Sequence, residues 1–276
     1  MEVLFLGTGG PRPDGRAASC NLILVYGQPR FFVDVGSGAF ARLGELHIDI
    51  DKVDTIFLTH LHVDHTADLP SVIKARVMLT TSPVHFTIYG PSGANDYPGT
   101  SRFMEILFGP GGAWAYLKHF GAPFDWEAHD LPNDLSAAPV LVSESKDGLR
   151  VTAVATHHGD APALAYRVDF NGRSVTFSGD IDPTGLPNLQ KLAEKTNLLV
   201  FNCAVLDPPG SPPELYTRHS PPKRVGELAR AARVDRLILT HIPPQVERAE
   251  KQVSRSIGAQ TDVQMSFAED KMRVTP

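Results

Sequence analysis

Cysteine is scarce in this sequence of 276 residues, and the two that occur, Cys20 and Cys203, lie far apart. They form no Cys-x-x-Cys pair, which excludes a disulfide scaffold and a zinc ribbon or finger. If the chain binds a metal ion, histidine and carboxylate side chains must hold it.

Long apolar runs and blocks of positive charge are also missing. No window approaches the about 18 consecutive apolar residues of a membrane helix, and residues 1–5 lack the basic start and apolar core of a signal peptide. The net charge is −5, which argues against a protein that mainly coats nucleic acid, because lysine and arginine neutralise phosphates. We expect a cytoplasmic protein without membrane contact, or a periplasmic one if a leader has been removed.

Short β-branched, apolar runs alternate with helical patterns along most of the chain, which is typical of an α/β fold. Predicted strands occupy residues 3–6, 21–26, 31–35, 55–59, 151–156, 164–170, 174–177, 199–204 and 237–240. Predicted helices occupy residues 38–46, 67–79, 189–198 and 222–232. Because strand groups in both halves are followed by helices, we predict two facing mixed sheets with helices outside, a four-layer αββα sandwich in one domain spanning residues 1–276.

Residues 92–147 depart from this pattern and are predicted to be an insertion rich in aromatic residues and glycine. Their aromatic residues include Phe103, Phe108, Trp114, Tyr116, Phe120, Phe124 and Trp126. One interpretation is a subdomain with its own small core, or the contact surface of a homodimer. The other is an aromatic lid that closes over a pocket, with glycines as hinges.

Three of the 11 histidines fall in residues 59–65, Thr-His-Leu-His-Val-Asp-His. This run follows a predicted strand, so it stands where the chain turns toward a helix. His60 and His62 alternate with Leu61 and can point the same way, and the turn brings Asp64 and His65 back to the same place. Burying so many titratable groups is unfavourable unless a metal ion compensates.

Histidine and carboxylate ligands favour zinc, with manganese or iron as alternatives. Four potential ligands in one short run exceed what a single catalytic site uses, since such a site keeps one position for water. We therefore expect two metal ions. The remaining ligands should follow other strand ends, and three such places are His157-His158, Asp180 and His241.

The run from His60 to His65 matches an HxHxDH signature, and with the later His, Gly179-Asp180 and Thr240-His241 it resembles the metallo-β-lactamase superfamily of metallohydrolases. Within it, the chain is most similar to the ribonuclease Z-like and arylsulfatase-like branch. Further similar segments follow in order at residues 5–11, 32–38, 163–167, 177–180, 218–220 and 237–241. The resemblance covers most of the chain except residues 92–147.

The resemblance implies a set of seven metal ligands. His60, His62 and one of His157 and His158 would hold the first ion, Asp64, His65 and His241 the second, and Asp180 would bridge them. His158 is preferred because the ligand of this family is often followed by glycine. Asp34 would orient a ligand imidazole.

The resemblance also implies a mechanism in which a hydroxide bridging the two metal ions attacks an ester. Asp64 or Asp180 would take up the remaining proton. His219 would donate a proton to the leaving group or contact a phosphate. The alternative for His219 is a surface histidine in a proline-rich loop.

The tRNA-processing enzymes of this branch carry a long arm that grips the tRNA body. The intervals between His158 and Asp180 and between Asp180 and His219 leave no room for it, and Pro221 stands where serine or threonine is expected. We therefore predict a small phosphodiester or sulfate ester as substrate, with tRNA 3′ endonuclease activity on folded tRNA disfavoured. The alternative enzyme activity is hydrolysis of a lactone or a β-lactam. The alternative outside the enzymes is a non-catalytic metal-binding accessory protein.

Overall fold

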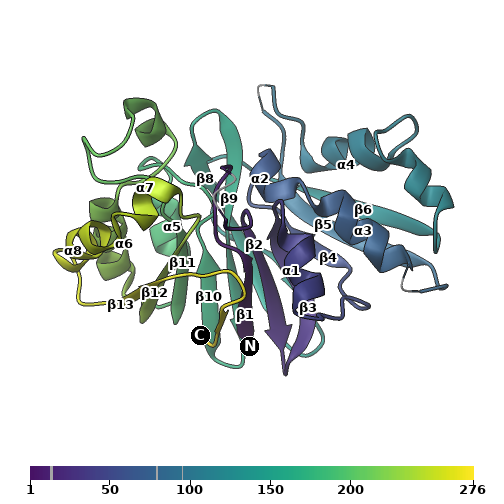
Figure 1. Cartoon of the computed structure of the whole chain (residues 1–276), viewed down its shortest axis with the longest axis horizontal. Helices are drawn as coiled ribbons and strands as arrows, with labels where there is room; N and C mark the ends of the chain where they lie inside the picture. Colours follow the sequence, from purple (N-terminus) through teal and green to yellow (C-terminus); the bar gives the residue numbers. More distant parts are fainter. Residues whose placement is uncertain (13–14, 79, 95) are drawn as a thin grey trace.

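The computed structural model describes residues 1–12, 15–78, 80–94 and 96–276. Two seven-stranded sheets face each other, and helices cover their outer faces (Figure 1). The predicted four-layer αββα sandwich is therefore confirmed. The two chain termini lie close together at one end of the sandwich, because the first and last strands pair with each other.

The first sheet has antiparallel pairing on one side and parallel pairing on the other. Its strand order is β14 (Arg273–Val274), β1 (Glu2–Gly7), β2 (Cys20–Val25), β3 (Gln28–Val35), β4 (Thr55–Phe57), β5 (Val84–Pro91) and β6 (Phe124–Leu131). The parallel part places the carboxyl ends of β3, β4 and β5 at the same edge.

The second sheet repeats this mixed plan. Its order is β13 (Gln264–Phe267), β12 (Arg236–Thr240), β11 (Leu198–Asn202), β10 (Arg173–Phe177), β9 (Ala161–Phe170), β8 (Arg150–His158) and β7 (Val140–Glu144). Asn171 and Gly172 form the turn that joins β9 to β10, and both residues have the positive φ, 48° and 72°, that a tight hairpin turn requires.

The helices lie outside the sheets, where their apolar faces are buried. On the first sheet they are α1 (Ala39–Glu45), α2 (Val63–Thr66), α3 (Leu69–Met78) and α4 (Thr100–Phe108), with the 3-10 helix η1 (Ala115–His119). On the second they are α5 (Leu186–Leu192), α6 (Pro222–Ala232), α7 (Pro244–Glu247) and α8 (Glu250–Gly258), with the 3-10 helix η2 (Pro213–Thr217). Predicted helix 189–198 thus begins and ends earlier, and Lys195 beyond it has a left-handed φ of 53°.

Strands buried on both faces build three cores. In β1, Leu4 and Leu6 face the helices, whereas Val3 and Phe5 face the opposite sheet, as the two-residue period of a strand requires. Between the sheets, Phe57 is fully buried and packs against Phe31, Tyr89 and Tyr166. Burying one such side chain contributes about 1.5–3 kcal/mol, so this core fixes the two sheets relative to each other.

Residues 92–147, predicted as an insertion, contribute α4, η1, β6 and β7. β6 forms the edge of the first sheet and β7 the edge of the second, so the segment joins both layers. Phe108 and Phe124 pack in the core beneath the helices of the first sheet. Tyr116 and Phe120, in contrast, are 51% and 50% exposed.

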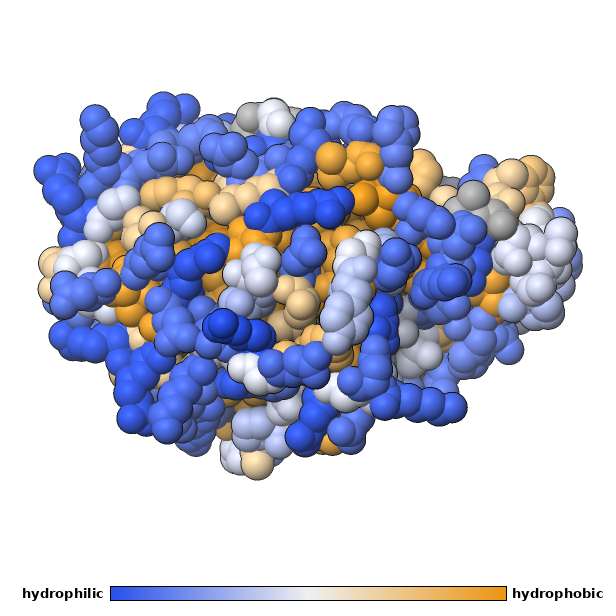
Figure 2. Space-filling model, turned by 90° about the horizontal axis from the view of Figure 1, so that it is seen from below, coloured by the Kyte–Doolittle hydropathy of each residue, from blue (hydrophilic) through white to orange (hydrophobic). Residues whose placement is uncertain are grey.

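Polar side chains cover most of the end at which the termini lie, with hydrophobic patches between them (Figure 2). The carboxyl ends of β3 and β4 point to the opposite end of the sandwich. Among the described residues, no helix is long and apolar enough to cross a membrane.

Candidate metal centre

The seven predicted ligands lie together at the carboxyl ends of strands from both sheets. His60 to His65 follow β4, His158 is the last residue of β8, Asp180 follows β10, and His241 follows β12. Rigid strands therefore hold the backbone on either side of the site, while the turns that follow them aim the side chains inward.

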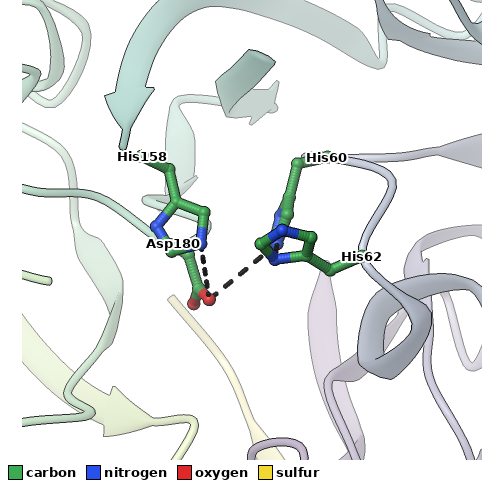
Figure 3. A group of neighbouring side chains, drawn as sticks. All are labelled: His60, His62, His158 and Asp180. Carbon is green, nitrogen blue, oxygen red and sulfur yellow. Dashed lines mark hydrogen bonds and ion pairs between the residues drawn. The ribbon is translucent and has the colours of Figure 1, made fainter. Parts of the chain in front are cut away.

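The side chains form two groups, and within each group the candidate ligand atoms lie within 4.8 Å of one another. The first group is His60, His62, His158 and Asp180, and the second is Asp64, His65 and His241. Figure 3 shows the three rings of the first group and the Asp180 carboxylate pointing toward one another.

Asp180 links the two groups. Its Oδ2 lies 3.5 Å from His158 Nε2 and 3.8 Å from His60 Nε2 in the first group. In the second group, its Oδ1 lies 3.5 Å from His241 Nε2, and its Oδ2 lies 3.8 Å from His65 Nε2. One carboxylate thus faces both sets of imidazoles, as the resemblance implies for a bridging residue.

The run that follows β4 gathers four of the seven side chains through local geometry. His60 Nε2 lies 3.0 Å from His62 Nδ1, and His62 stands immediately before the short helix α2. Asp64 and His65 occupy that helix, so they turn back toward the strand end. Asp64 Oδ2 lies 3.2 Å from His241 Nε2, which joins the two sheets across the site.

Burial and mutual charge set the protonation of the group. Burial lowers the pKa of His60 and of His158, which favours neutral rings. Burial opposes ionisation of Asp180, but His241 and the other surrounding imidazoles outweigh it and hold the pKa of this carboxyl well below its usual value. The neutral His60 and His158 rings and the ionised Asp180 carboxylate are the forms in which such side chains bind metal ions.

Asp34 contacts His65 at Nδ1, the ring nitrogen that faces away from the second group. Its Oδ2 lies 2.8 Å from His65 Nδ1, and its Oδ1 accepts a hydrogen bond of 2.8 Å from the Thr59 N–H. Burial works against a charged His65, but the Asp34 carboxylate outweighs it and raises the pKa of His65 to about 9. His65 Nε2 is buried without a hydrogen-bond partner and faces the second group.

Two ordinary residues at the site have left-handed backbones, Asp34 with φ 60° and His241 with φ 58°. Such conformations cost about 1–3 kcal/mol each and persist where the surrounding structure imposes them. Gly10 gives the His241 ring its room, since a Cβ at that position would lie 2.8 Å from His241 Cε1. The site is therefore built by sterically demanding turns.

These observations fit divalent metal ions. The donors are imidazole nitrogens and carboxylate oxygens in two compact groups, and His65 Nε2 is an orphaned buried atom that a metal ion would satisfy. The groups are thus able to bind metal ions.

His157 and His158 are separated by the alternation of the strand. His158 points into the first group, whereas His157 Nδ1 lies 2.5 Å from Asp182 Oδ2. Adjacent residues of a strand face opposite sides, so only one of the two can join the group.

The sequence analysis missed two residues that touch the site. Asn202 donates from Nδ2 to Asp180 Oδ1 over 2.8 Å, and Tyr97 Oη lies 3.0 Å from His62 Nε2. Asn202 ends the apolar strand β11, so its position at a strand end was a usable signal. Tyr97 stands outside any predicted strand or helix, and nothing in its neighbourhood marked it.

His219 is buried, with 8% of its surface exposed, so it is not a surface histidine. Its ring lies between those of His158 and His241, with centroid distances of 5.1 and 5.9 Å. Burial lowers the pKa of His219 to about 4, although Asp180 acts in the other direction. Its Nδ1 is buried and has no hydrogen-bond partner among the described residues.

A cavity of about 410 Å³ opens beside His219 and His241. Its other lining residues combine apolar side chains with two arginines and a glutamine: Pro11, Arg12, Ala204, Gly210, Pro212, Leu215, Pro243, Gln245 and Arg248. Within the described part of the chain, neither Arg12 nor Arg248 forms an ion pair with an acidic side chain. The cavity is therefore suited to an anionic ligand that also has an apolar part.

The family model of the beta-lactamase superfamily domain matches residues 30–242, a range that contains all seven candidate ligands. The chain belongs to the metallo-β-lactamase superfamily. It is a hydrolase of that superfamily, and the resemblance predicted from the HxHxDH run is confirmed.

Relatives in this superfamily match almost end to end. A ribonuclease Z of Mycolicibacterium gilvum is 29% identical, with 99% of this chain and 96% of the relative covered. A ribonuclease Z of Mycobacterium avium is 30% identical, covering 94% and 92%.

Solved structures share the fold. Human tRNase Z, short form, has a TM-score of 0.76 at 23% identity, covering 100% of this chain and 99% of that one. The metallo-beta-lactamase fold protein YhfI from Bacillus subtilis has a TM-score of 0.75 at 18% identity, covering 99% and 98%.

These relatives overturn the predicted substrate. The prediction of a small phosphodiester or sulfate ester, with folded tRNA unlikely, is wrong, because the relatives named ribonuclease Z match over most of both chains. The error was to treat the missing arm as an exclusion. Only the β9–β10 hairpin lies between His158 and Asp180, yet relatives bearing this name are matched along 92% and 96% of their length. Proteins of about the length of this chain are therefore named ribonuclease Z.

Proposed function

We propose that this hydrolase is an endoribonuclease of the ribonuclease Z type, which cleaves a phosphodiester bond at the 3′ end of a precursor tRNA. The observation that carries the proposal is the nearly full-length match to chains named ribonuclease Z. The two arginines in the cavity beside the site support it, because they suit the phosphates of an RNA strand.

We infer that the site holds two metal ions, zinc in the first place, with manganese or iron as alternatives. His60, His62 and His158 would hold one ion, Asp64, His65 and His241 the other, and Asp180 both. When bound, the ions would lower the pKa of a coordinated water and stabilise the charge on the phosphate oxygens.

The chain's own groups orient the RNA around this centre. The buried Nδ1 of His219 lacks a partner among the described residues, so it can donate a hydrogen bond to an oxygen of the scissile phosphate. Asp64 and Asp180 are the carboxylates placed to take up a proton. Arg12 and Arg248 would hold phosphates in the cavity that His241 also lines.

The cavity gives the RNA a place next to the scissile bond. Its 410 Å³ lies within the range of about 300–1,000 Å³ found for small-ligand pockets, so it can take one nucleotide. Pro212, Leu215 and Pro243 offer an apolar wall for a base. In the absence of an arm, these local contacts must supply much of the grip on RNA.

The test is cleavage of a precursor tRNA with a 3′ trailer by the zinc-loaded full-length chain. We expect one internal cut that releases an intact trailer. Asp180→Asn should abolish the cut, whereas Asp169→Asn, at a partly buried pair with Arg167 away from the site, should leave it unchanged. No cleavage with zinc, manganese or iron would overturn the proposal, and so would a ladder of products shortened one nucleotide at a time.

RNA binding by arginine variants tests the cavity contacts. Arg248→Ala should weaken binding and reduce the salt dependence by about one phosphate contact. Arg233→Ala is the control, because this arginine pairs with Glu194 on the surface at 2.6 Å. Equal loss in both variants would show that binding is not localised to the cavity.

A further inference from the structure

His62 differs from the other six candidate ligands because it alone is only partly buried. The other six are enclosed by the sheets and by their neighbours. His62 stands at the junction between the strand end and α2, and it is not fully enclosed there. A ligand in this position needs a specific contact to hold its ring in one orientation.

The two ring nitrogens of His62 have different neighbours. Nδ1 lies 3.0 Å from His60 Nε2 and faces the first group, while Nε2 lies 3.0 Å from Tyr97 Oη. A neutral imidazole carries one proton, and the nitrogen that faces a metal ion must be free of it. In the metal-binding form, Nε2–H therefore donates its hydrogen bond to the Tyr97 hydroxyl.

Tyr97 is held firmly enough to serve as such a partner. It lies between β5 and α4, and its N–H donates to the Ala94 carbonyl over 3.0 Å. Gly93 and Gly99 approach closely, since a Cβ at Gly93 would lie 2.6 Å from the Gly99 nitrogen. This contact closes the ends of the segment on each other, and only a residue without a side chain fits there.

The surroundings of Tyr97 place it at the meeting of the two sheets. Asp160, in the turn between β8 and β9 of the second sheet, and Arg218, which pairs with it at 3.1 Å, are charged groups near its hydroxyl.

We propose that Tyr97 is a positioning residue for the first metal ion, acting through His62. Its hydroxyl fixes the proton of His62 on Nε2 and turns Nδ1 toward His60, His158 and Asp180. This inference rests on the metal centre of the proposed function and extends it to a residue outside the seven ligands. Partners of this kind change metal affinity by about 10 to 100-fold when they are removed.

The test measures zinc affinity of the full-length chain by competition with a chromogenic chelator. Tyr97→Phe removes only the hydroxyl, and Tyr116→Phe is the control because Tyr116 is exposed and lies on η1. Both changes are made in two backgrounds. In His241→Ala the first group remains intact, and in His158→Ala the second group does.

We expect Tyr97→Phe to weaken zinc binding by about 10-fold or more in the His241→Ala background and not in the His158→Ala background. The visible spectrum of bound Co²⁺ should change only in the former. The inference would be overturned if Tyr97→Phe left the zinc affinity unchanged in both backgrounds. A matching loss in both, with a lower melting temperature of the metal-free chain, would also overturn it, because it would show a structural role.

The proposed metal centre and the role of Tyr97 fail in different ways. If the unaltered chain binds no zinc, the centre itself is refuted and the inference with it. If the chain binds zinc and cleaves no RNA, the proposed substrate is refuted while the effect of Tyr97 on affinity still stands or falls by its own measurement.

Discussion

Replacing Asp34 by asparagine should weaken the binding of a metal ion without disturbing the fold. The reason is that the substitution changes which nitrogen of His65 carries the ring proton. Asp34 accepts from the Thr59 N–H at Oδ1 and faces His65 Nδ1 at Oδ2, both over 2.8 Å. Asparagine keeps one oxygen for Thr59 and turns its NH2 group toward His65. His65 Nδ1 must then accept a hydrogen bond, so the ring proton moves to Nε2.

That proton would occupy the nitrogen the second group needs. His65 Nε2 lies 3.8 Å from the carboxylates of Asp64 and Asp180, and a protonated nitrogen offers no lone pair to a metal ion. Losses of about 10 to 100-fold in affinity are typical for such partners. These correspond to about 1.4–2.8 kcal/mol, at 1.4 kcal/mol for each factor of ten.

The assay is zinc competition in the His158→Ala background, in which the second group alone remains intact. Asp68→Asn is a matched control, since that carboxylate accepts from the Phe40 N–H over 2.9 Å and touches none of the ligands. Unchanged zinc affinity in Asp34→Asn would refute the reasoning about the His65 proton.

Three further predictions concern the same centre. His158→Ala should reduce the metal content measured by elemental analysis, whereas His157→Ala should keep it, because only His158 points into the first group; equal contents would contradict the assignment. Gly10→Ala should lower the RNA cleavage rate at least about 10-fold by displacing the His241 ring. Gly44→Ala, where a Cβ meets no atom within 4 Å, should not, and matching rates would show that the ring tolerates the contact. Removing the metal with a chelator should lower the melting temperature, since ligand at about 100 times its Kd stabilises by about 2.7 kcal/mol; calorimetry showing no shift would argue against binding to the folded state.

Much of the site could be predicted from the sequence because its densest part is local. His60, His62, Asp64 and His65 share one strand end and one helical turn, so their spacing alone brings them together. His158, Asp180 and His241 were found because each polar residue follows an apolar strand, and strand ends meet at one edge. The αββα plan followed from the same alternation of strands and helices.

The substrate prediction failed for a different physical reason. An arm is one way to hold a tRNA, and its absence says nothing about phosphate contacts beside the site. The cavity with Arg12 and Arg248 combines residues from near both ends of the chain, and no local pattern joins them. The strands of segment 92–147 likewise follow from no local pattern, because they complete both sheets only through pairing with distant partners.

The sequence by itself determined the donor atoms, histidine and carboxylate, and the strand ends that carry them, because both depend on residue type and short-range periodicity. Only the tertiary structure decided the partners that orient those donors: Asp34 for His65, Asn202 for Asp180 and Tyr97 for His62. Each of these is a single hydrogen bond between residues distant in the chain, and it exists only once neighbouring strands of one sheet have paired: β3 with β4, β10 with β11 and β4 with β5.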